Sequence, residues 1–224
     1  MSISDKNKKF SKLAALFVLL LFAIWSLSTK DMIATESHIF EVKKGSSMGS
    51  IAKELSNKGF IKSELFFTSF SKFLNANKKL KSGYYEILPG TSVWTFIDKI
   101  STGSVLSTKV TLIEGKTIKF YFNQLTNDPS IKPSGSLKEV MTSIGINEPY
   151  DGWFFPETYS FNYGESLENV LKRAHQELMK NLMVLWDQRD KGLPLKSPYE
   201  AIILASLIEN ETAVDEEKSL ISGV

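Results

Sequence analysis

Two glutamates near the end of the chain, Glu209 and Glu211, have the residue type and setting for acid–base chemistry. They follow a mostly apolar run over residues 201–208, which favours a helix that is apolar nearly all round and therefore buried on every side. In such a helix Glu209 shares a face with Ile202 and Ala205, while Glu211 lies about 200° further round. The two carboxyl groups therefore do not face one point. We expect Glu209 to be the more buried, and partial desolvation favours the protonated form that a general acid needs.

The start of this helix is marked by Ser197, Pro198 and Glu200, a pattern that predicts a capping box with proline at the first helical position. A simpler interpretation is that Glu209 and Glu211 only mark the point where a core helix emerges into solvent. Periodicity alone favours the simpler interpretation, and the spacing does not decide between the two.

A second cluster of functional side chains is the aromatic-rich segment 151–159, which reads DGWFFPETY. Aromatic faces beside hydrogen-bonding groups suit sugar rings, whose C–H faces are apolar and whose rims are hydroxylated. Trp153, Glu157 and Tyr159 are therefore candidate substrate-binding residues. The alternative is a rigid loop whose large aromatic side chains fill the core.

Other chemistries find little support in the composition. The chain has no cysteine, which excludes disulfides, thiolate chemistry and Cys-ligated metals. Its two histidines, His38 and His175, have no carboxylates at ligand spacing, and no nucleophile-elbow motif is present, so we predict neither a metal site nor a serine-hydrolase centre. The formal net charge of +2, without a basic stripe interleaved with aromatics, gives no reason to expect nucleic acid as a partner.

The N-terminal segment has the pattern of an export and anchoring signal. Lysines at positions 6, 8, 9 and 12 precede an apolar stretch from Leu13 to Leu27. Positive charge ahead of such a stretch keeps the N-terminus in the cytoplasm. We expect a cytoplasmic segment at 1–12, a single-pass anchor at 13–28 in the inner or plasma membrane, and the rest on the outer, periplasmic side. The polar sequence that follows offers no convincing cleavage site, which favours an anchor over a cleaved signal.

The residues at 38–105 are predicted to form a small α+β unit. A strand at 39–42 is followed by a helix whose apolar residues fall at i, i+3, i+4 and i+7 from Met48. Ser63 is expected to cap a second helix, and a strand at 83–87 completes the order strand, helix, helix, strand.

The residues at 108–224 are predicted to form a second α+β unit. It begins with a strand at 109–113. Its longest helix is expected over 166–190, with Ser166 as the cap and a buried apolar stripe that continues to Leu185.

Three segments together resemble the endolytic murein transglycosylases, or YceG-like family. They read VTLIEGKT at 110–117, DGWFFPETY at 151–159 and ASLIENET at 205–212. The second resembles the family motif acidic-Gly-x-x-Phe-Pro-acidic-Thr-Tyr, and the third resembles the signature Ala-Ser-Ile-Val-Glu-Lys-Glu-Thr. The first Glu of that signature is the family's proposed catalytic residue, and it falls at Glu209.

The resemblance implies an α+β fold with an N-terminal transmembrane helix, a LysM-like domain at 38–105 and a YceG-like catalytic domain at 108–224. It implies cleavage of the bond between N-acetylmuramic acid and N-acetylglucosamine in nascent strands, leaving 1,6-anhydro ends and needing no cofactor or metal. The implied partners are peptidoglycan glycan strands, the cell membrane and cell-wall synthesis proteins. Beyond the catalytic Glu209, the substrate-binding residues are predicted to be Trp153, Glu157, Tyr159, Glu211 and Glu217.

The chain also departs from the family pattern. Glu217 and Lys218 stand where the family has an acidic-Arg pair, and the sequence stops at Val224, before the family's Asn-Arg-Leu element. We therefore expect a catalytic domain whose C-terminal part is missing. Two other classes of protein remain as alternatives: a non-catalytic, membrane-anchored peptidoglycan-binding or scaffold module, and a soluble cytosolic α+β protein.

Overall fold

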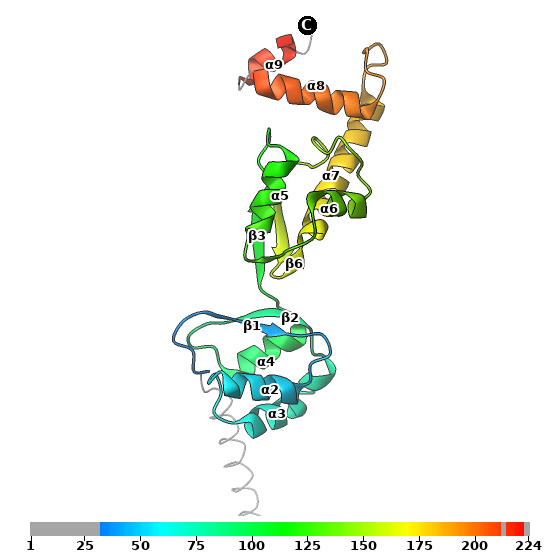
Figure 1. Ribbon diagram of the computed structural model, residues 1–224. Helices are drawn as coiled ribbons and strands as arrows, with labels where there is room; N and C mark the ends of the chain where they lie inside the picture. Colours follow the sequence, from blue (N-terminus) through cyan, green and yellow to red (C-terminus); the bar gives the residue numbers. More distant parts are fainter. Residues whose placement is uncertain (1–31, 212–213, 222–224) are drawn as a thin grey trace, which may run out of the picture. The chain divides into compact units, whose positions relative to one another are not determined.

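The computed structural model of the protein describes residues 32–211 and 214–221. The chain divides into two compact units between Leu106 and Ser107, and each is described by itself (Figure 1). The membrane anchor predicted at 13–28 lies outside the described residues. Within the described ranges, no helix is both long enough and apolar enough to span a bilayer.

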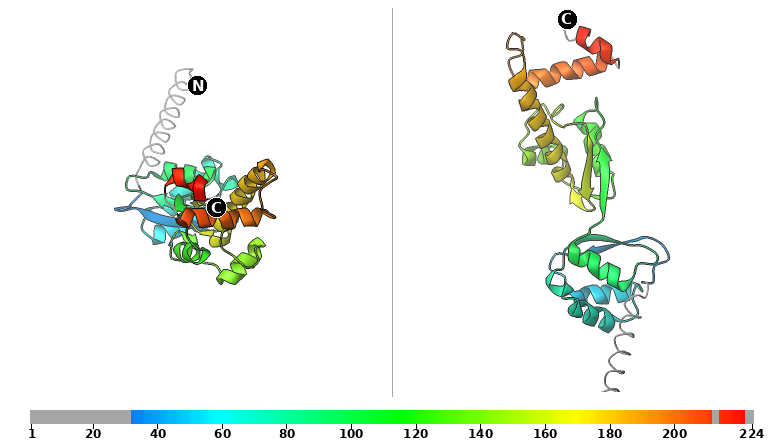
Figure 2. Two further views of the ribbon diagram at one scale, coloured as in Figure 1. Left: turned by 90° about the horizontal axis from the view of Figure 1, so that it is seen from above. Right: turned by 180° about the vertical axis from the view of Figure 1, so that it is seen from behind.

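The first unit contains a two-stranded antiparallel sheet with helices on one side. Strand β1 (His38–Val42) pairs with β2 (Gly83–Ile87). The other elements are α2 (Met48–Asn57), α3 (Glu64–Phe73), the 3-10 helix η1 (Ala76–Lys78) and α4 (Val93–Thr102). Of the three α-helices, α3 lies furthest from the strands (Figure 1 and Figure 2).

Serine caps and apolar spacing account for these helices. Ser47, Ser63 and Ser92 precede α2, α3 and α4, and each side-chain oxygen accepts a backbone N–H from the first turn. Apolar side chains then turn toward the core, where the buried rings of Phe40 and Phe96 meet edge to face at 5.7 Å. The predicted order of strand, helix, helix and strand is confirmed, whereas the short helix η1 is not foreseen by the sequence.

The second unit is also a mixed α+β structure, so the predicted fold class is confirmed at that level. Strand β3 (Ser107–Thr111) lies slightly before the predicted 109–113 and pairs antiparallel with β5 (Thr158–Asn162). The short strands β4 (Ile131–Lys132) and β6 (Glu165–Ser166) pair in parallel. The helices are α5 (Ile118–Thr126), α6 (Leu137–Ile144), α7 (Leu167–Gln188), α8 (Pro198–Glu211) and α9 (Asp215–Ile221).

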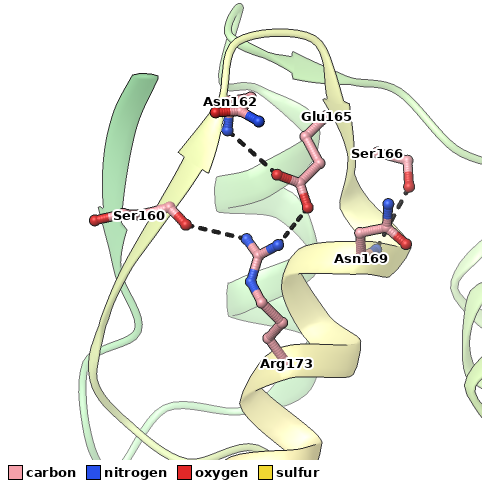
Figure 3. Close-up of polar contacts among 6 residues, drawn as sticks. All are labelled: Ser160, Asn162, Glu165, Ser166, Asn169 and Arg173. Carbon is pink, nitrogen blue, oxygen red and sulfur yellow. Dashed lines mark hydrogen bonds and ion pairs between the residues drawn. The ribbon is translucent and has the colours of Figure 1, made fainter. Parts of the chain in front are cut away.

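A polar cluster joins β5, β6 and the start of α7 (Figure 3). Arg173 of α7 forms an ion pair with Glu165 and donates to the carbonyl oxygen of Ser160 at 3.2 Å. The Glu165 carboxylate also accepts the backbone N–H of Asn162 at 3.2 Å. Ser166 accepts a backbone N–H from the first turn of α7, which confirms the predicted cap. One guanidinium group thereby fixes the β5–β6 turn to the helix that continues toward the cleft described below.

Two predictions about burial are wrong. Helix α8 is not buried on every side: it has no buried residue, and Ile203 and Leu207 are exposed. The apolar stripe of α7 is buried only as far as Ala174, and Leu185 is 66% exposed. In the described part of the chain, α8 packs mainly against α7 and α9, so much of its apolar surface has no neighbour to cover it.

Candidate active site

The second unit contains a cleft of 820 Å³ between α7, α8 and two loops. One loop, at 114–117, leads into α5, and the other, at 151–156, belongs to the aromatic-rich segment. Helices α7 and α8 supply most of the remaining lining: Leu178, Asn181, Leu182, Leu185, Trp186, Ala201, Ile202, Ala205, Ser206, Glu209 and Asn210. Helix α5 adds Ile118 and Tyr121. Arg189 and Leu195, which follow α7, complete the wall.

Glu209 lies on the cleft side of α8 together with Ile202 and Ala205, as the helical spacing predicts. Glu211 is not among the described residues that line the cleft, so the two carboxyl groups face different directions, also as predicted. Because α8 is not buried on every side, Glu209 is more exposed than a residue of such a helix would be, and its side chain is 40% exposed. Its Oε2 accepts a hydrogen bond from the Lys218 Nζ of α9 at 3.0 Å.

The contact with Lys218 bears directly on what Glu209 can do. A carboxylate that accepts this hydrogen bond has no proton to give, so acting as an acid requires protonation and release from Lys218. Both side chains are a third or more exposed, and ion pairs of that kind contribute only about 0–1 kcal/mol. The pair can therefore open at small cost when a substrate enters the cleft.

The turn at Gly152 and Trp153 holds the first half of α8 in position. Gly152 has a φ of +83°, and a Cβ at this position would lie 2.8 Å from Cγ2 of Ile202, so glycine permits the close approach. The Trp153 ring stacks on Tyr199 with centroids 4.8 Å apart and planes inclined by 11°. Since Glu209 lies on the same helix, these contacts also set the position of its carboxyl group.

Two further groups near the cleft have structural partners. Asp151 Oδ1 accepts the backbone N–H of Ile118 at 2.7 Å, which ties the loop at 151–156 to the first turn of α5. His175 Nδ1 lies 2.9 Å from the carbonyl oxygen of Trp153, so this ring braces the same loop from α7. Among the described residues, no group of three His, Cys, Asp or Glu side chains could hold a metal ion.

The other predicted substrate-binding residues lie outside the cleft lining. Trp153 is half-buried against α8, and the Tyr159 hydroxyl donates to the carbonyl oxygen of Phe155 at 2.7 Å. Burial, with a smaller effect from the charge of Glu157, raises the pKa of Tyr159 to about 12. Glu157 and Glu217 are exposed. Of the residues predicted to be catalytic or substrate-binding, only Glu209 lines the cleft, and the binding roles of the others stay predictions.

Three cleft residues on or just after α7 were not singled out from the sequence: Asn181, Trp186 and Arg189. The Arg189 guanidinium lies 3.5 Å from the Trp186 ring centroid, and its Nη1 donates to the Trp186 carbonyl oxygen at 2.7 Å. These residues follow Leu178 and Leu182 at helical spacing. The sequence predicts a buried stripe along this part of the helix, and that spacing does not distinguish a buried stripe from one that faces an open cleft.

Fold and site together define a mixed α+β protein with a carboxyl group on the wall of a largely apolar cleft. The sequence matches the YceG-like family over residues 40–224. The chain therefore belongs to the YceG-like family, and the resemblance inferred from the three motifs is confirmed.

Similar proteins in two organisms carry the name endolytic murein transglycosylase. That of Streptococcus pneumoniae (strain ATCC BAA-255 / R6) is 26% identical over 217 residues, covering 82% of this chain and 38% of the relative. That of Bacillus subtilis (strain 168) is 24% identical over 209 residues, covering 82% of this chain and 56% of the relative. The chain thus spans between 38% and 56% of the length of these relatives.

A crystal structure of a YceG-like protein from Listeria monocytogenes is also similar to this chain. The two share 19% sequence identity over 83% of this chain and 67% of the other, with a TM-score of 0.33. A score at that level supports no structural conclusion.

Proposed function

We propose that the protein is a membrane-anchored endolytic murein transglycosylase in which Glu209 acts first as acid and then as base. The observation that carries the proposal is the position of Glu209 on the wall of the 820 Å³ cleft. Support comes from the membership of the chain in the YceG-like family and from the name of its relatives in S. pneumoniae and B. subtilis.

The proposed reaction needs one carboxyl group and no water. Protonated Glu209 gives its proton to the glycosidic oxygen as that oxygen leaves C1 of an N-acetylmuramic acid unit. The resulting carboxylate then takes the proton of the C6 hydroxyl of the same sugar, whose oxygen bonds to C1 and closes a 1,6-anhydro ring. Glu209 ends protonated, as it began, and N-acetylglucosamine leaves on the other strand end. Most glycosidases need two carboxyl groups at the scissile bond. The proposed reaction uses Glu209 alone, so Glu211 does not have to face the substrate.

The lining of the cleft suits a sugar chain. Apolar side chains such as Leu178 and Leu182 can cover the C–H faces of the rings, and Trp186 offers an aromatic face. The amide of Asn181 can bond to ring substituents, and the guanidinium of Arg189 can bind a carboxylate of an attached peptide.

We further propose that residues 1–12 are cytoplasmic, that 13–28 anchor the protein in the cell membrane, and that the described units lie on the outer side. The basis is the run of lysines before an apolar stretch in the sequence. On that side an anchored enzyme would meet nascent glycan strands and could associate with cell-wall synthesis proteins.

The test of the catalytic role compares Glu209→Gln with Glu211→Gln. The two changes are chemically identical and lie on the same helix, but only Glu209 lines the cleft. Glu209→Gln should abolish the release of anhydro-ended muropeptides from purified peptidoglycan, measured by mass spectrometry, and Glu211→Gln should retain most of it. Circular dichroism checks that both variants keep their helices. Anhydro products from Glu209→Gln at the parental level would refute the assignment.

A second candidate function is a non-catalytic module that holds peptidoglycan or a cell-wall synthesis protein. The contact between Glu209 and Lys218 favours it, because a carboxylate engaged with an ammonium group acts as an acceptor. Sedimentation with insoluble peptidoglycan, followed by product analysis, separates the two functions. Binding by the parent protein without any anhydro ends would support the module over the enzyme.

A further inference from the structure

The first unit exposes an aromatic face, carried mainly by α3, the helix that lies furthest from its sheet (Figure 1). We use this name for Leu65, Phe66, Phe70 and Phe73 of α3 together with Trp94 of α4. The Phe70 ring is itself buried, at 6% exposure, and connects the others: it lies 5.5 Å from the ring of Phe66, 6.5 Å from that of Phe73 and 5.8 Å from that of Trp94. Leu65 is 78% exposed, Phe73 74% and Trp94 48%. Adjoining exposed side chains of this size commonly mark a surface that contacts something apolar.

The segment that carries most of the aromatic face is rich in lysine. The segment 61–81, which contains α3 and η1, has five lysines and one glutamate, so its formal net charge is +4. Lys72 lies in the last turn of α3, and Lys78 and Lys79 follow within a few residues. A surface that combines aromatic rings with lysines fits the boundary of an anionic bilayer, where rings enter the headgroup layer and ammonium groups meet phosphates.

The chain enters the first unit close to this face. The backbone N–H of Met32 donates to the carbonyl oxygen of Thr91 at 2.7 Å, and Met32 itself is buried. Trp94 follows Thr91 by three residues, in the first turn of α4. If the anchor ends at residue 28, the connection to Met32 reaches no more than about 14 Å. An anchored chain therefore has its entry point, and the neighbouring Trp94, near the bilayer surface.

We propose that the aromatic face lies on the headgroup layer of the membrane, so that the first unit is docked on the bilayer rather than held away from it. The proposal rests on the anchoring proposed above. A glycan strand could also stack on aromatic rings, but it would need neither the lysines nor the closeness of the face to the chain entry. The bilayer is therefore the occupant that the observations favour.

The test uses the complete chain in vesicles of phosphatidylethanolamine with phosphatidylglycerol. The chain has no cysteine, so a polarity-sensitive fluorophore can be placed on Leu65→Cys or Phe73→Cys, with Glu41→Cys at an exposed position of β1 as the matched control. All three positions are exposed, so labelling leaves the core intact. Labels at 65 and 73 should emit at shorter wavelength than the label at 41 and lose most of their emission to lipids brominated near the headgroup. Omitting phosphatidylglycerol should weaken both effects.

The outcomes separate the docking from the anchoring. If the chain stays with floated vesicles after an alkaline wash but labels at 65 and 73 behave like the label at 41, docking is refuted and anchoring stands. If the chain leaves the vesicles, both are refuted. If peptidoglycan fragments rather than lipids shift the labels at 65 and 73, the face is a glycan-binding surface and the proposal is wrong.

Discussion

Replacing Gly152 by alanine should loosen helix α8 more than the same change at any glycine without a close neighbour. Gly152 has a φ of +83°, and its added Cβ would lie 2.8 Å from Cγ2 of Ile202. Gly115 is the matched control, because its φ is +70° and nothing lies within 4 Å of a Cβ placed there. Both changes carry the backbone cost of an L-residue in the left-handed region, roughly 1–2 kcal/mol.

Only Gly152→Ala also adds a steric overlap, between its Cβ and Cγ2 of Ile202. Overpacking of this kind destabilises by roughly a further 1–3 kcal/mol. A difference of that size in local opening free energy corresponds to roughly a 5- to 150-fold faster amide exchange in α8. The assay is hydrogen exchange read by mass spectrometry on peptides that cover Pro198–Glu211. In a background with Ile202→Ala the overlapping methyl group is gone, so Gly152→Ala/Ile202→Ala compared with Ile202→Ala alone should show only the backbone cost.

The reasoning would be refuted if Gly152→Ala and Gly115→Ala changed exchange in α8 equally. It would also be refuted if Gly152→Ala accelerated exchange in α8 as much with Ile202→Ala present as without it. The overlap with the Ile202 methyl group would then not be the cause of the faster exchange. Because Glu209 lies on α8, we further expect Gly152→Ala to reduce anhydro-product formation more than Gly115→Ala.

Three other changes test the structure of the second unit. Tyr199→Leu should lower the stability by about 1 kcal/mol through lost stacking on Trp153, while Tyr199→Phe keeps most of it, as thermal melting can measure. Arg173→Met should cost about 1–2 kcal/mol in denaturant unfolding, because it leaves the half-buried Glu165 carboxylate without its partner. The pKa of Tyr159 is about 12 in the folded chain, whereas an unperturbed tyrosine has a pKa of 10.0. The folded state thus keeps a proton that the unfolded state releases, so stability should fall as the pH rises above 10, and Tyr159→Phe should flatten that fall.

The sequence predicted the beginnings of helices well because capping is local. Ser63 and Ser166 each precede an apolar periodic run, and in the structure each accepts the expected backbone N–H. Ser197 does the same for α8. The Glu200 carboxylate, however, accepts the backbone N–H of Lys196 at 2.7 Å, where a capping box would have that of Ser197. The residues in each of these contacts lie within a few positions of one another along the chain. The sequence alone is therefore enough to predict where these helices begin.

The sequence failed where the answer depended on elements distant along the chain. The pairing of β4 with β6 involves two residues on each side, too few for any periodic signal. The burial of α8 depends on which elements pack around it, and the apolar composition of the helix does not show which elements those are. For the same reason Asn181 and Arg189 were missed: nothing local to α7 shows that its second half faces an open cleft.

The location of Glu209 depends on a small set of contacts rather than on the core. The core of the second unit takes in α5, α6 and the first half of α7, and it buries no residue of α8. Helix α8 is instead positioned by its packing against α7 and α9, by the Gly152–Ile202 approach and by the Trp153–Tyr199 stack. A helix held in this way can open locally at a lower free energy than the core it adjoins. Substitutions in the turn at Gly152 and Trp153 should therefore shift the Glu209 carboxyl group more than equally severe substitutions in the core of the unit.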